Sequence, residues 1–197
     1  MYKKGSGGVL DIILDEITND IMVELEKTQK EFWNIARETG VMLNMFIKMM
    51  NVQNALEIGT SNGYSGIWLA KALKKTGGHL TTIEFYDKRQ SVAIENFKAC
   101  SVDDIITPLL GSAIMILENL PDDEKYDFVF IDANKQEYIK YFNLIKPHLA
   151  SKCLITADNI LSHEKKVKPF VDAINADNDF QFEILNLPAG LLVAYRS

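Results

Sequence analysis

The chain has 197 residues, of which 47% are hydrophobic and 24% are charged, and this composition excludes disordered, collagen-like and low-complexity classes. Its length predicts one domain over residues 1–197. The formal net charge of −6 argues against broad non-specific binding to nucleic acids or membranes.

The first 50 residues are predicted to form helices. Apolar residues recur at helical spacing from Val9 to about Glu38, which predicts two helices split near Thr18–Asn19. Gly40 is expected to break the helical pattern, and the almost wholly apolar segment Val41–Met50 to form a buried helix. Because the N-terminal helices over residues 9–50 carry more apolar surface than a small sheet edge requires, we expect a homodimer.

From residue 51 onward, short apolar runs alternate with helical patterns. The expected strands are Ala55–Ile58, Leu80–Glu84, Ile105–Leu109, Phe128–Ile131, Cys153–Ala157, Phe182–Leu185 and Leu191–Tyr195. The expected helices are Tyr64–Lys75, Lys88–Ala99, Ala113–Leu120, Lys135–Leu149 and Glu164–Asn175. This alternation predicts an α/β core over residues 51–197, with a parallel sheet covered by helices on both faces. The short link Asn186–Gly190 leaves no room for a helix, so the last two strands should pair antiparallel.

No segment marks the chain for export or for a membrane. The N-terminus lacks the apolar stretch of a signal peptide, and no run of about 18 uncharged apolar residues occurs. Cys100 and Cys153 lie in apolar segments, which is typical of buried thiols in a reducing compartment. The sequence therefore predicts a cytoplasmic protein with no membrane partner.

Glycines and acids follow the first two predicted strands, at the sheet edge where open α/β proteins bind ligands. Gly59, Gly63 and Gly66 permit a tight turn and a close backbone approach before a helix. Glu57 suits an amino group better than a pyrophosphate, and Glu84 ends the second strand, where nucleotide-binding proteins accept ribose hydroxyls. The pattern predicts a ligand with a ribose and a cation but no diphosphate. The alternative is that the glycines only allow the turn and that Glu84 is a solvated acid.

Three oxygen-bearing side chains follow the fourth and fifth predicted strands. Asp132, Asp158 and Asn159 suit Mg²⁺, Mn²⁺ or Ca²⁺ rather than zinc or copper. Lys135 follows Asp132 by one helical turn, and a lysine beside a divalent cation can act as a base. The alternatives are ordinary turn chemistry for the three ligands and an exposed position for the lysine.

Three segments of the chain match one family. LEIGTSNGYSGIWLA, FVFIDANKQEYIKYF and ITADNIL resemble the small, metal-dependent class I S-adenosylmethionine O-methyltransferases, the group of catechol and caffeoyl-CoA O-methyltransferases. The resemblance runs from about Ile35 to the C-terminus. It implies a Rossmann-like, doubly wound sheet of seven mostly parallel strands with the last antiparallel. It also implies S-adenosylmethionine and a divalent cation as cofactors and a small-molecule hydroxyl acceptor.

The resemblance further implies which residues bind the cofactor. Glu84 would bind the ribose hydroxyls, Phe85 would flank the adenine, and Ile35 would contribute a backbone contact. The whole implied set is Ile35, Glu57, Gly59, Thr60, Ser65, Glu84, Phe85, Gly111, Ser112, Ala113 and Asp132.

The same resemblance assigns the chemistry to the residues that follow the fourth and fifth predicted strands. Asp132, Asp158 and Asn159 match the family's metal ligands, and Lys135 matches the catalytic lysine. Lys135 and Asp132 are the expected catalytic residues. The expected reaction is methyl transfer to a catechol-like hydroxyl, with Lys135 removing its proton.

The chain departs from the family pattern in segments that bear on the acceptor. These segments are Ala150–Lys152, Ser162–Glu164 and Pro188–Gly190, together with Ser112 in the third-strand loop. A tRNA 5-hydroxyuridine methyltransferase is an alternative, because the lysines within 165–168 could follow a phosphate backbone. A non-catalytic S-adenosylmethionine-binding protein is a second alternative. The glycine spacing argues against a third, a nicotinamide-dependent oxidoreductase.

Overall fold

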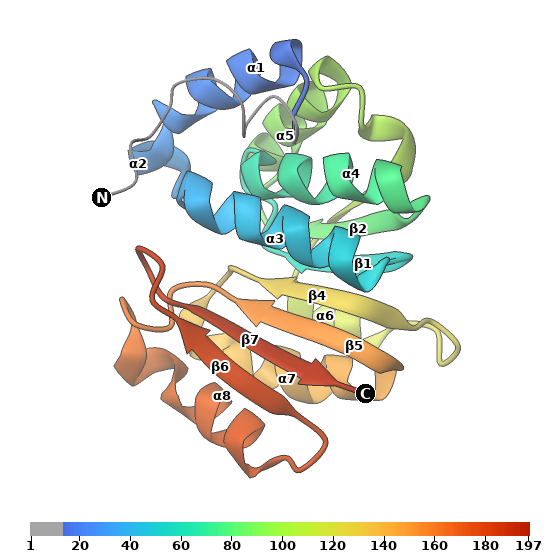
Figure 1. Ribbon diagram of the computed structural model, residues 1–197, viewed down its shortest axis with the longest axis vertical. Helices are drawn as coiled ribbons and strands as arrows, with labels where there is room; N and C mark the ends of the chain where they lie inside the picture. The colour runs from blue at the N-terminus through green and yellow to red at the C-terminus, as the bar shows by residue number, and fades with distance from the viewer. Residues whose placement is uncertain (1–13) are drawn as a thin grey trace.

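A computed structural model describes residues 14–197, which form one seven-stranded sheet with helices on both faces (Figure 1). The strand order is β3-β2-β1-β4-β5-β7-β6. The strands are β1 (Asn54–Ile58), β2 (His79–Glu84), β3 (Ile106–Leu110), β4 (Tyr126–Ile131), β5 (Leu149–Ala157), β6 (Gln181–Leu185) and β7 (Leu191–Arg196). Strand β7 runs antiparallel to both β5 and β6, while every other pair is parallel. The predicted Rossmann-like, doubly wound sheet with an antiparallel last strand is confirmed.

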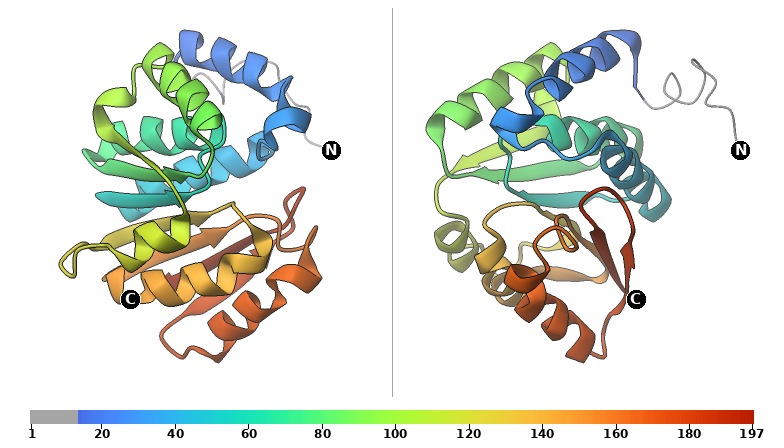
Figure 2. Two further views of the ribbon diagram at one scale, coloured as in Figure 1. Left: turned by 180° about the vertical axis from the view of Figure 1, so that it is seen from behind. Right: turned by 90° about the vertical axis from the view of Figure 1, so that its left-hand side faces the viewer.

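The helices divide between the two faces of the sheet (Figure 2). They are α1 (Glu16–Glu26), α2 (Gln29–Phe32), α3 (Arg37–Met50), α4 (Tyr64–Thr76), α5 (Asp87–Ala99), α6 (Ala113–Glu118), α7 (Tyr138–Ile145) and α8 (Glu164–Ala176). Buried side chains of α3, α4 and α5 form one apolar core against the sheet, and those of α6, α7 and α8 form a second core on its other face. No helix within residues 14–197 is long and apolar enough to cross a bilayer.

Helix α1 differs from the sequence-based prediction. The predicted split near Thr18–Asn19 is wrong, because both residues lie inside one continuous helix. The side chain of Asp15 caps this helix by accepting a hydrogen bond of 2.9 Å from the backbone N–H of Thr18. The break between two helices lies later, at residues 27–28 between α1 and α2, and α2 ends at Trp33, whose φ of 57° is left-handed. The predicted start of the first helix at Val9 lies outside the described residues.

Helix α3 differs from the prediction in two ways. It runs through Gly40 without a break. A Cβ at this position would clash with the ring of Trp68 on α4. The glycine therefore allows close helix packing instead of ending the helix. The helix is also only half buried, since Met45 is 43% exposed and Met49 is 76% exposed.

The segment predicted as one helix over Lys135–Leu149 is shorter. It consists of a 3₁₀ turn (Lys135–Glu137), helix α7 and a second 3₁₀ turn (Lys146–His148). Pro147 lies in the second turn, where it cannot donate to a helical hydrogen bond. Strand β5 consequently begins at Leu149, four residues earlier than expected.

Candidate active site

A cleft of about 510 Å³ lies at the carboxyl ends of the central strands, within the size range of small-molecule sites. Segments from both halves of the chain line it, including the link between α2 and α3 and the turns after β1, β2, β3 and β4. The predicted site residues along its walls are Ile35, Gly59, Thr60, Ser65, Glu84, Phe85, Gly111, Ser112, Ala113, Asp132 and Lys135. The structure therefore brings most of the predicted residues together.

Gly59 brings two walls of the cleft close to each other. Its φ is +107°, and a Cβ there would clash with the backbone carbonyl of Asp132. Only glycine meets both conditions without strain. Because of this contact, the turn after β1 and the end of β4 border the same space.

Glu57 lies behind the cleft wall and does not line it. Its carboxylate is completely buried and accepts hydrogen bonds from the hydroxyls of Ser65 at 2.5 Å and Thr82 at 2.6 Å. Burial raises the pKa of Glu57 to about 7, although these two hydrogen bonds oppose the rise. The Glu57 carboxylate thus holds the first turn of α4, which carries Ser65, from behind the cleft wall.

Glu84 marks one end of the cleft. Its carboxylate accepts backbone hydrogen bonds from Ser61 at 2.8 Å and from Tyr86 at 2.9 Å, and the residue is 6% exposed. An ionised carboxylate can accept about four hydrogen bonds, so acceptor capacity remains for a ligand hydroxyl. Phe85 lies beside it with its side chain largely exposed. We refer to this part of the cleft as the nucleoside end.

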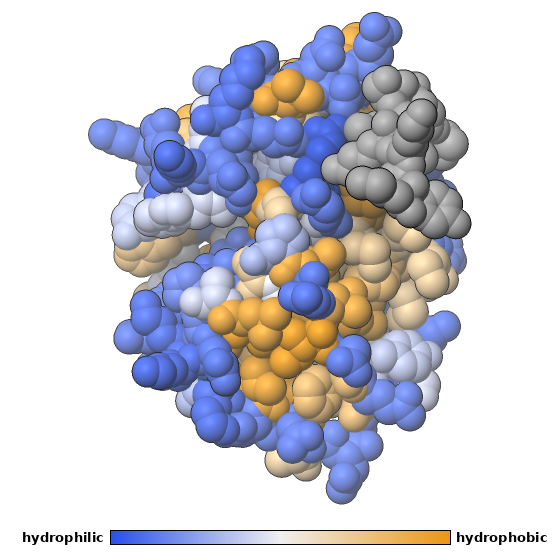
Figure 3. Space-filling model, turned by 60° about the vertical axis from the view of Figure 1, so that its left-hand side comes forward, coloured by the Kyte–Doolittle hydropathy of each residue, from blue (hydrophilic) through white to orange (hydrophobic). Residues whose placement is uncertain are grey.

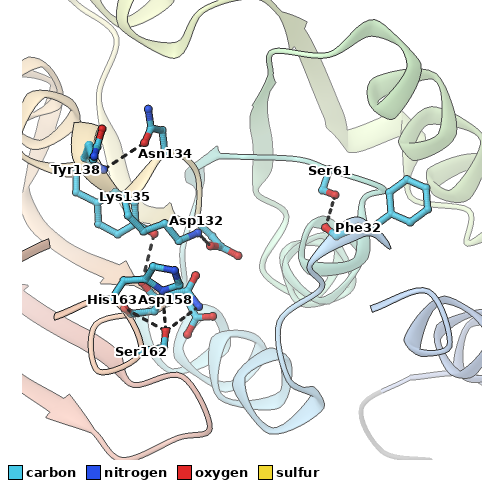
Figure 4. A network of polar contacts seen from close by, with 11 residues as sticks. Phe32, Ser61, Asp132, Asn134, Lys135, Tyr138, Asp158, Ser162 and His163 are labelled. Carbon is cyan, nitrogen blue, oxygen red and sulfur yellow. Dashed lines mark hydrogen bonds and ion pairs between the residues drawn. The ribbon is translucent and has the colours of Figure 1, made fainter. Parts of the chain in front are cut away.

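The ends of β4 and β5 form a charged cluster (Figure 4). The Nζ of Lys135 lies 2.8 Å from Oδ1 of Asp132. The backbone N–H of Asp158 donates to the carbonyl of Ile131 at 3.1 Å, which fixes the end of β5 beside β4. Asp158 and Asn159 follow this contact but do not line the cleft.

The oxygen donors of this cluster fit a divalent cation. Asp158 is 2% exposed, and its Oδ1 has no hydrogen-bond partner within residues 14–197. Burial and the charge of Asp132 raise the pKa of Asp158, although the backbone N–H of Asn159 and the charge of Lys135 oppose the rise. No group of three His, Cys, Asp or Glu side chains suited to a metal occurs in the described part of the chain. A cation here would therefore depend on the amide oxygen of Asn159 in addition to the two aspartates.

Two segments that depart from the family pattern meet near this cluster. The backbone N–H of Leu161 donates to the carbonyl of Ala189 at 3.0 Å, so the loop after β5 packs on the link between β6 and β7. The hydroxyl of Ser162 lies 3.0 Å from Nδ1 of His163. Burial and the charge of Lys135 lower the pKa of His163. The two unusual loops thus pack on each other, and Ser162 and His163 lie beside Asp158 (Figure 4).

Sequence reasoning missed several residues that line the cleft, including five with aromatic or charged side chains. These five are Trp33, Tyr86, Arg89, Glu137 and Tyr141. The hydroxyl of Tyr141 donates to Glu137 at 2.6 Å, and the guanidinium of Arg89 lies 4.4 Å from the centre of the Trp33 ring. The sequence signal that could have identified these residues is their closeness along the chain to the predicted site residues Ile35, Glu84 and Lys135.

Comparisons with known proteins agree on one family. A family model described as O-methyltransferase matches residues 12–186. The catechol O-methyltransferase of Niastella koreensis is 34% identical over 134 residues, covering 67% of this chain and 60% of that protein. The caffeoyl-CoA O-methyltransferase of Medicago sativa is 31% identical over 159 residues, covering 77% and 64%. The chain thus spans less than two thirds of the length of these relatives.

Solved structures share the fold. The O-methyltransferase of Bacillus cereus, solved in complex with SAH, superposes with a TM-score of 0.82 at 24% identity over 95% of both chains. TomG of Streptomyces achromogenes, an O-methyltransferase involved in tomaymycin synthesis and solved with SAM, gives 0.81 at 23% identity over 95% of this chain and 94% of that one. At these identities the likeness shows a common fold.

Proposed function

The chain belongs to the O-methyltransferase family, and we propose that it transfers the methyl group of S-adenosylmethionine to a hydroxyl of a small catechol-like acceptor. The observation that carries this proposal is the cleft itself. It joins Glu84 at one end to the Lys135–Asp132 pair near the other, so a nucleoside and a reacting hydroxyl can be held in one space.

The cofactor would occupy the cleft from the nucleoside end. Glu84 would accept hydrogen bonds from the ribose hydroxyls, and Phe85 would flank the adenine. The turn at Gly59 and Thr60 would approach the methionine part, supported from behind by Glu57. Asp132 would lie near the methyl group because its backbone borders the same turn.

Lys135 would provide the base. In its neutral form it would accept the proton of the acceptor hydroxyl, the oxygen would form a bond to the methyl carbon, and the carbon–sulfur bond would break to leave S-adenosylhomocysteine. Alignment of the two reactants supplies roughly 7–11 kcal/mol of such a barrier. The charged cluster would therefore act mainly by placing the hydroxyl in line with the methyl group.

Asp132, Asp158 and Asn159 would hold a divalent cation, with Mg²⁺ preferred over Mn²⁺ or Ca²⁺. When bound, the cation would lower the pKa of the attacking hydroxyl and orient two adjacent acceptor oxygens. The unpartnered Oδ1 of Asp158 supports this assignment.

The assembly and location of the protein are also proposals. The exposed methionines of α3 support a homodimer, and the two free, buried cysteines, Cys100 and Cys153, support a reducing, cytoplasmic location.

Calorimetric titration tests the proposed function. S-adenosylhomocysteine should bind the purified protein, and catechol should then bind only when Mg²⁺ is present. Glu84→Gln should weaken binding of S-adenosylhomocysteine, while Glu95→Gln on the exposed side of α5 should not.

Each outcome directs the next step. Nucleotide binding without metal-dependent catechol binding would contradict the catechol assignment and direct the acceptor search to tRNA. Absence of nucleotide binding would contradict the proposed methyltransferase activity.

A further inference from the structure

A tryptophan and an arginine that line the cleft form a cation–π pair. Trp33 belongs to the link between α2 and α3, and Arg89 belongs to the first turn of α5. The guanidinium carbon of Arg89 lies 4.4 Å from the centre of the Trp33 ring and 5.5 Å from the centre of the Tyr86 ring. Both members of the pair line the cleft, so the contact joins two of its walls.

The main chain on both sides of Trp33 is held by hydrogen bonds, whereas the Trp33 ring is largely exposed. The hydroxyl of Ser61 donates to the carbonyl of Phe32 at 2.7 Å, as Figure 4 shows. The side chain of Gln29 donates to the carbonyl of Asn34 at 3.1 Å. In contrast, the Trp33 side chain is 69% exposed. The main chain beside Trp33 is thus held in place, while its ring is exposed to solvent.

Arg89 forms no ion pair with any residue of 14–197, because no carboxylate of these residues lies within salt-bridge distance of its guanidinium. Its neighbours are the aromatic rings of Trp33 and Tyr86, and Tyr86 in turn contacts Phe85 with 5.1 Å between ring centres. The arginine thus connects Trp33 to a continuous row of rings beside Glu84.

We propose that Trp33 and Arg89 form a clamp over the nucleoside end of the cleft and slow the release of the adenosyl cofactor. This inference rests on the proposed function. Trp33 and Arg89 are positioning residues in this view, since the clamp covers the bound nucleoside and takes no part in methyl transfer. A guanidinium stacked on an indole gains enough free energy to retard opening and is still weak enough to allow turnover.

Dissociation kinetics test the clamp directly. Tritium-labelled S-adenosylmethionine bound to the full chain is chased with excess unlabelled cofactor, and the dissociation rate is measured for the wild type and the variants. Arg89→Gln and Trp33→Ala should each dissociate about two- to fivefold faster, as expected for loss of an exposed cation–π contact. The double variant should be no faster than either single variant, because the two side chains act as one unit.

Matched variants separate the clamp from general effects. Lys88→Gln removes the same charge from an exposed neighbouring position on α5 that does not line the cleft, and should retain the wild-type rate. Trp33→Phe keeps an aromatic ring for Arg89 and should restore most of the retention lost in Trp33→Ala.

Tryptophan fluorescence gives a second readout. The chain has two tryptophans, and Trp68 is completely buried away from the cleft. Binding of S-adenosylhomocysteine should therefore change the emission of the wild type and leave that of Trp33→Phe unchanged.

Equal dissociation rates for Arg89→Gln and Lys88→Gln, or effects of Arg89→Gln and Trp33→Ala that multiply in the double variant, would overturn the clamp while leaving the proposed function intact. Failure of the wild type to bind labelled cofactor would instead overturn the proposed function on which the clamp rests.

Discussion

The carboxylates around the cleft differ in their hydrogen-bond and ion-pair partners. Glu84 accepts two backbone N–H groups and Asp132 faces the ammonium of Lys135, whereas Glu57 accepts two hydroxyls and Asp158 keeps one oxygen without a partner. Burial favours the protonated form of a carboxylate, and it is the largest cause of the raised pKa of both Glu57 and Asp158. Glu57 and Asp158 are therefore the side chains at which pH and bound cations should act on this protein.

Glu57 should make the stability of the ligand-free protein depend on pH. Its pKa rises from 4.5 to about 7 on folding, because burial disfavours the charged form. Between these values the unfolded chain loses a proton that the folded chain keeps, so the free energy of unfolding should fall as pH rises from 4.5 to 7. The loss should reach about 3 kcal/mol and stay constant above pH 7.

Urea denaturation at several pH values measures this effect. Glu57→Gln should remove this part of the pH dependence, so the variant should gain stability relative to the wild type as pH rises from 5 to 8. The exposed Glu95→Gln is the control, and it should follow the wild type. A constant difference between Glu57→Gln and the wild type across this range would contradict the assignment.

Asp158→Ala should abolish methyl transfer and leave cofactor binding nearly unchanged. Asp158 is one of the proposed cation ligands, and it lies outside the walls of the cleft that would hold the nucleoside. The folded state should tolerate the change, since the variant removes a buried carboxylate with an unpartnered oxygen. Turnover of catechol with Mg²⁺ and titration with S-adenosylhomocysteine measure the two effects.

Asp172→Ala removes an exposed carboxylate of α8 and serves as the control, with turnover expected at the wild-type rate. Catechol turnover by Asp158→Ala would contradict the proposed mechanism.

At the level of elements, the N-terminal helices are tied to the turn that would bind the cofactor. The hydroxyl of Tyr64, at the start of α4, donates to Glu26 of α1 at 2.7 Å. Arg37 of α3 forms an ion pair with the same carboxylate at 2.6 Å. These contacts hold the link between α2 and α3 against the cleft, so the N-terminal helices form part of the site and do more than cover the sheet.

The packing of α3 on α4 should depend on Gly40. In an exposed helix, replacing glycine by alanine adds about 1 kcal/mol of stability. Here the added methyl would clash with the ring of Trp68, so Gly40→Ala should instead destabilise the protein by about 1–3 kcal/mol. Chemical denaturation measures the difference.

A double-mutant cycle with Trp68→Leu provides the control. The cost of Gly40→Ala should shrink when the indole ring is absent, because the two changes are coupled through one contact. Equal costs in both backgrounds would contradict the packing argument.

At the scale of the whole molecule, one face carries apolar side chains that the described chain does not cover. Figure 3 shows apolar residues gathered near the middle of a face of the molecule. On α3, Met45 and Met49 are 43% and 76% exposed, although the same helix buries its opposite side against the sheet. A second copy that packs on α3 would remove these methionines from water.

Light scattering after size exclusion should give a mass of about 45 kDa, twice the 22.3 kDa of one chain. Met49→Glu should shift the protein to the monomer by placing a charge in the interface. Met115→Glu introduces the same charge at a 65% exposed position on α6, which packs on the other face of the sheet, and it should remain dimeric. A wild-type mass of one chain, or equal behaviour of both variants, would contradict a dimer through α3.

The sequence alone determined which segments form the strands and which residues follow their carboxyl ends. Apolar periodicity is a local signal, and so are the glycines and acids that follow each strand, which is why Glu84 and the Asp132–Lys135 pair were identified before the fold was known. Parallel strands bring their carboxyl ends to one edge, so these separate local signals predicted one site.

Only the tertiary structure decided what depends on contacts between distant segments. Gly40 was predicted to break a helix. In the structure only a glycine fits there, because a Cβ would clash with the ring of Trp68, which is 28 residues away in the sequence. Glu57 was expected at the ligand, yet the hydroxyls of Ser65 and Thr82 hold it behind the wall. Trp33 was overlooked because its contact with Arg89 joins two segments that carry no shared local pattern. Packing of this kind is set by the three-dimensional fit of side chains, which periodicity and spacing do not encode.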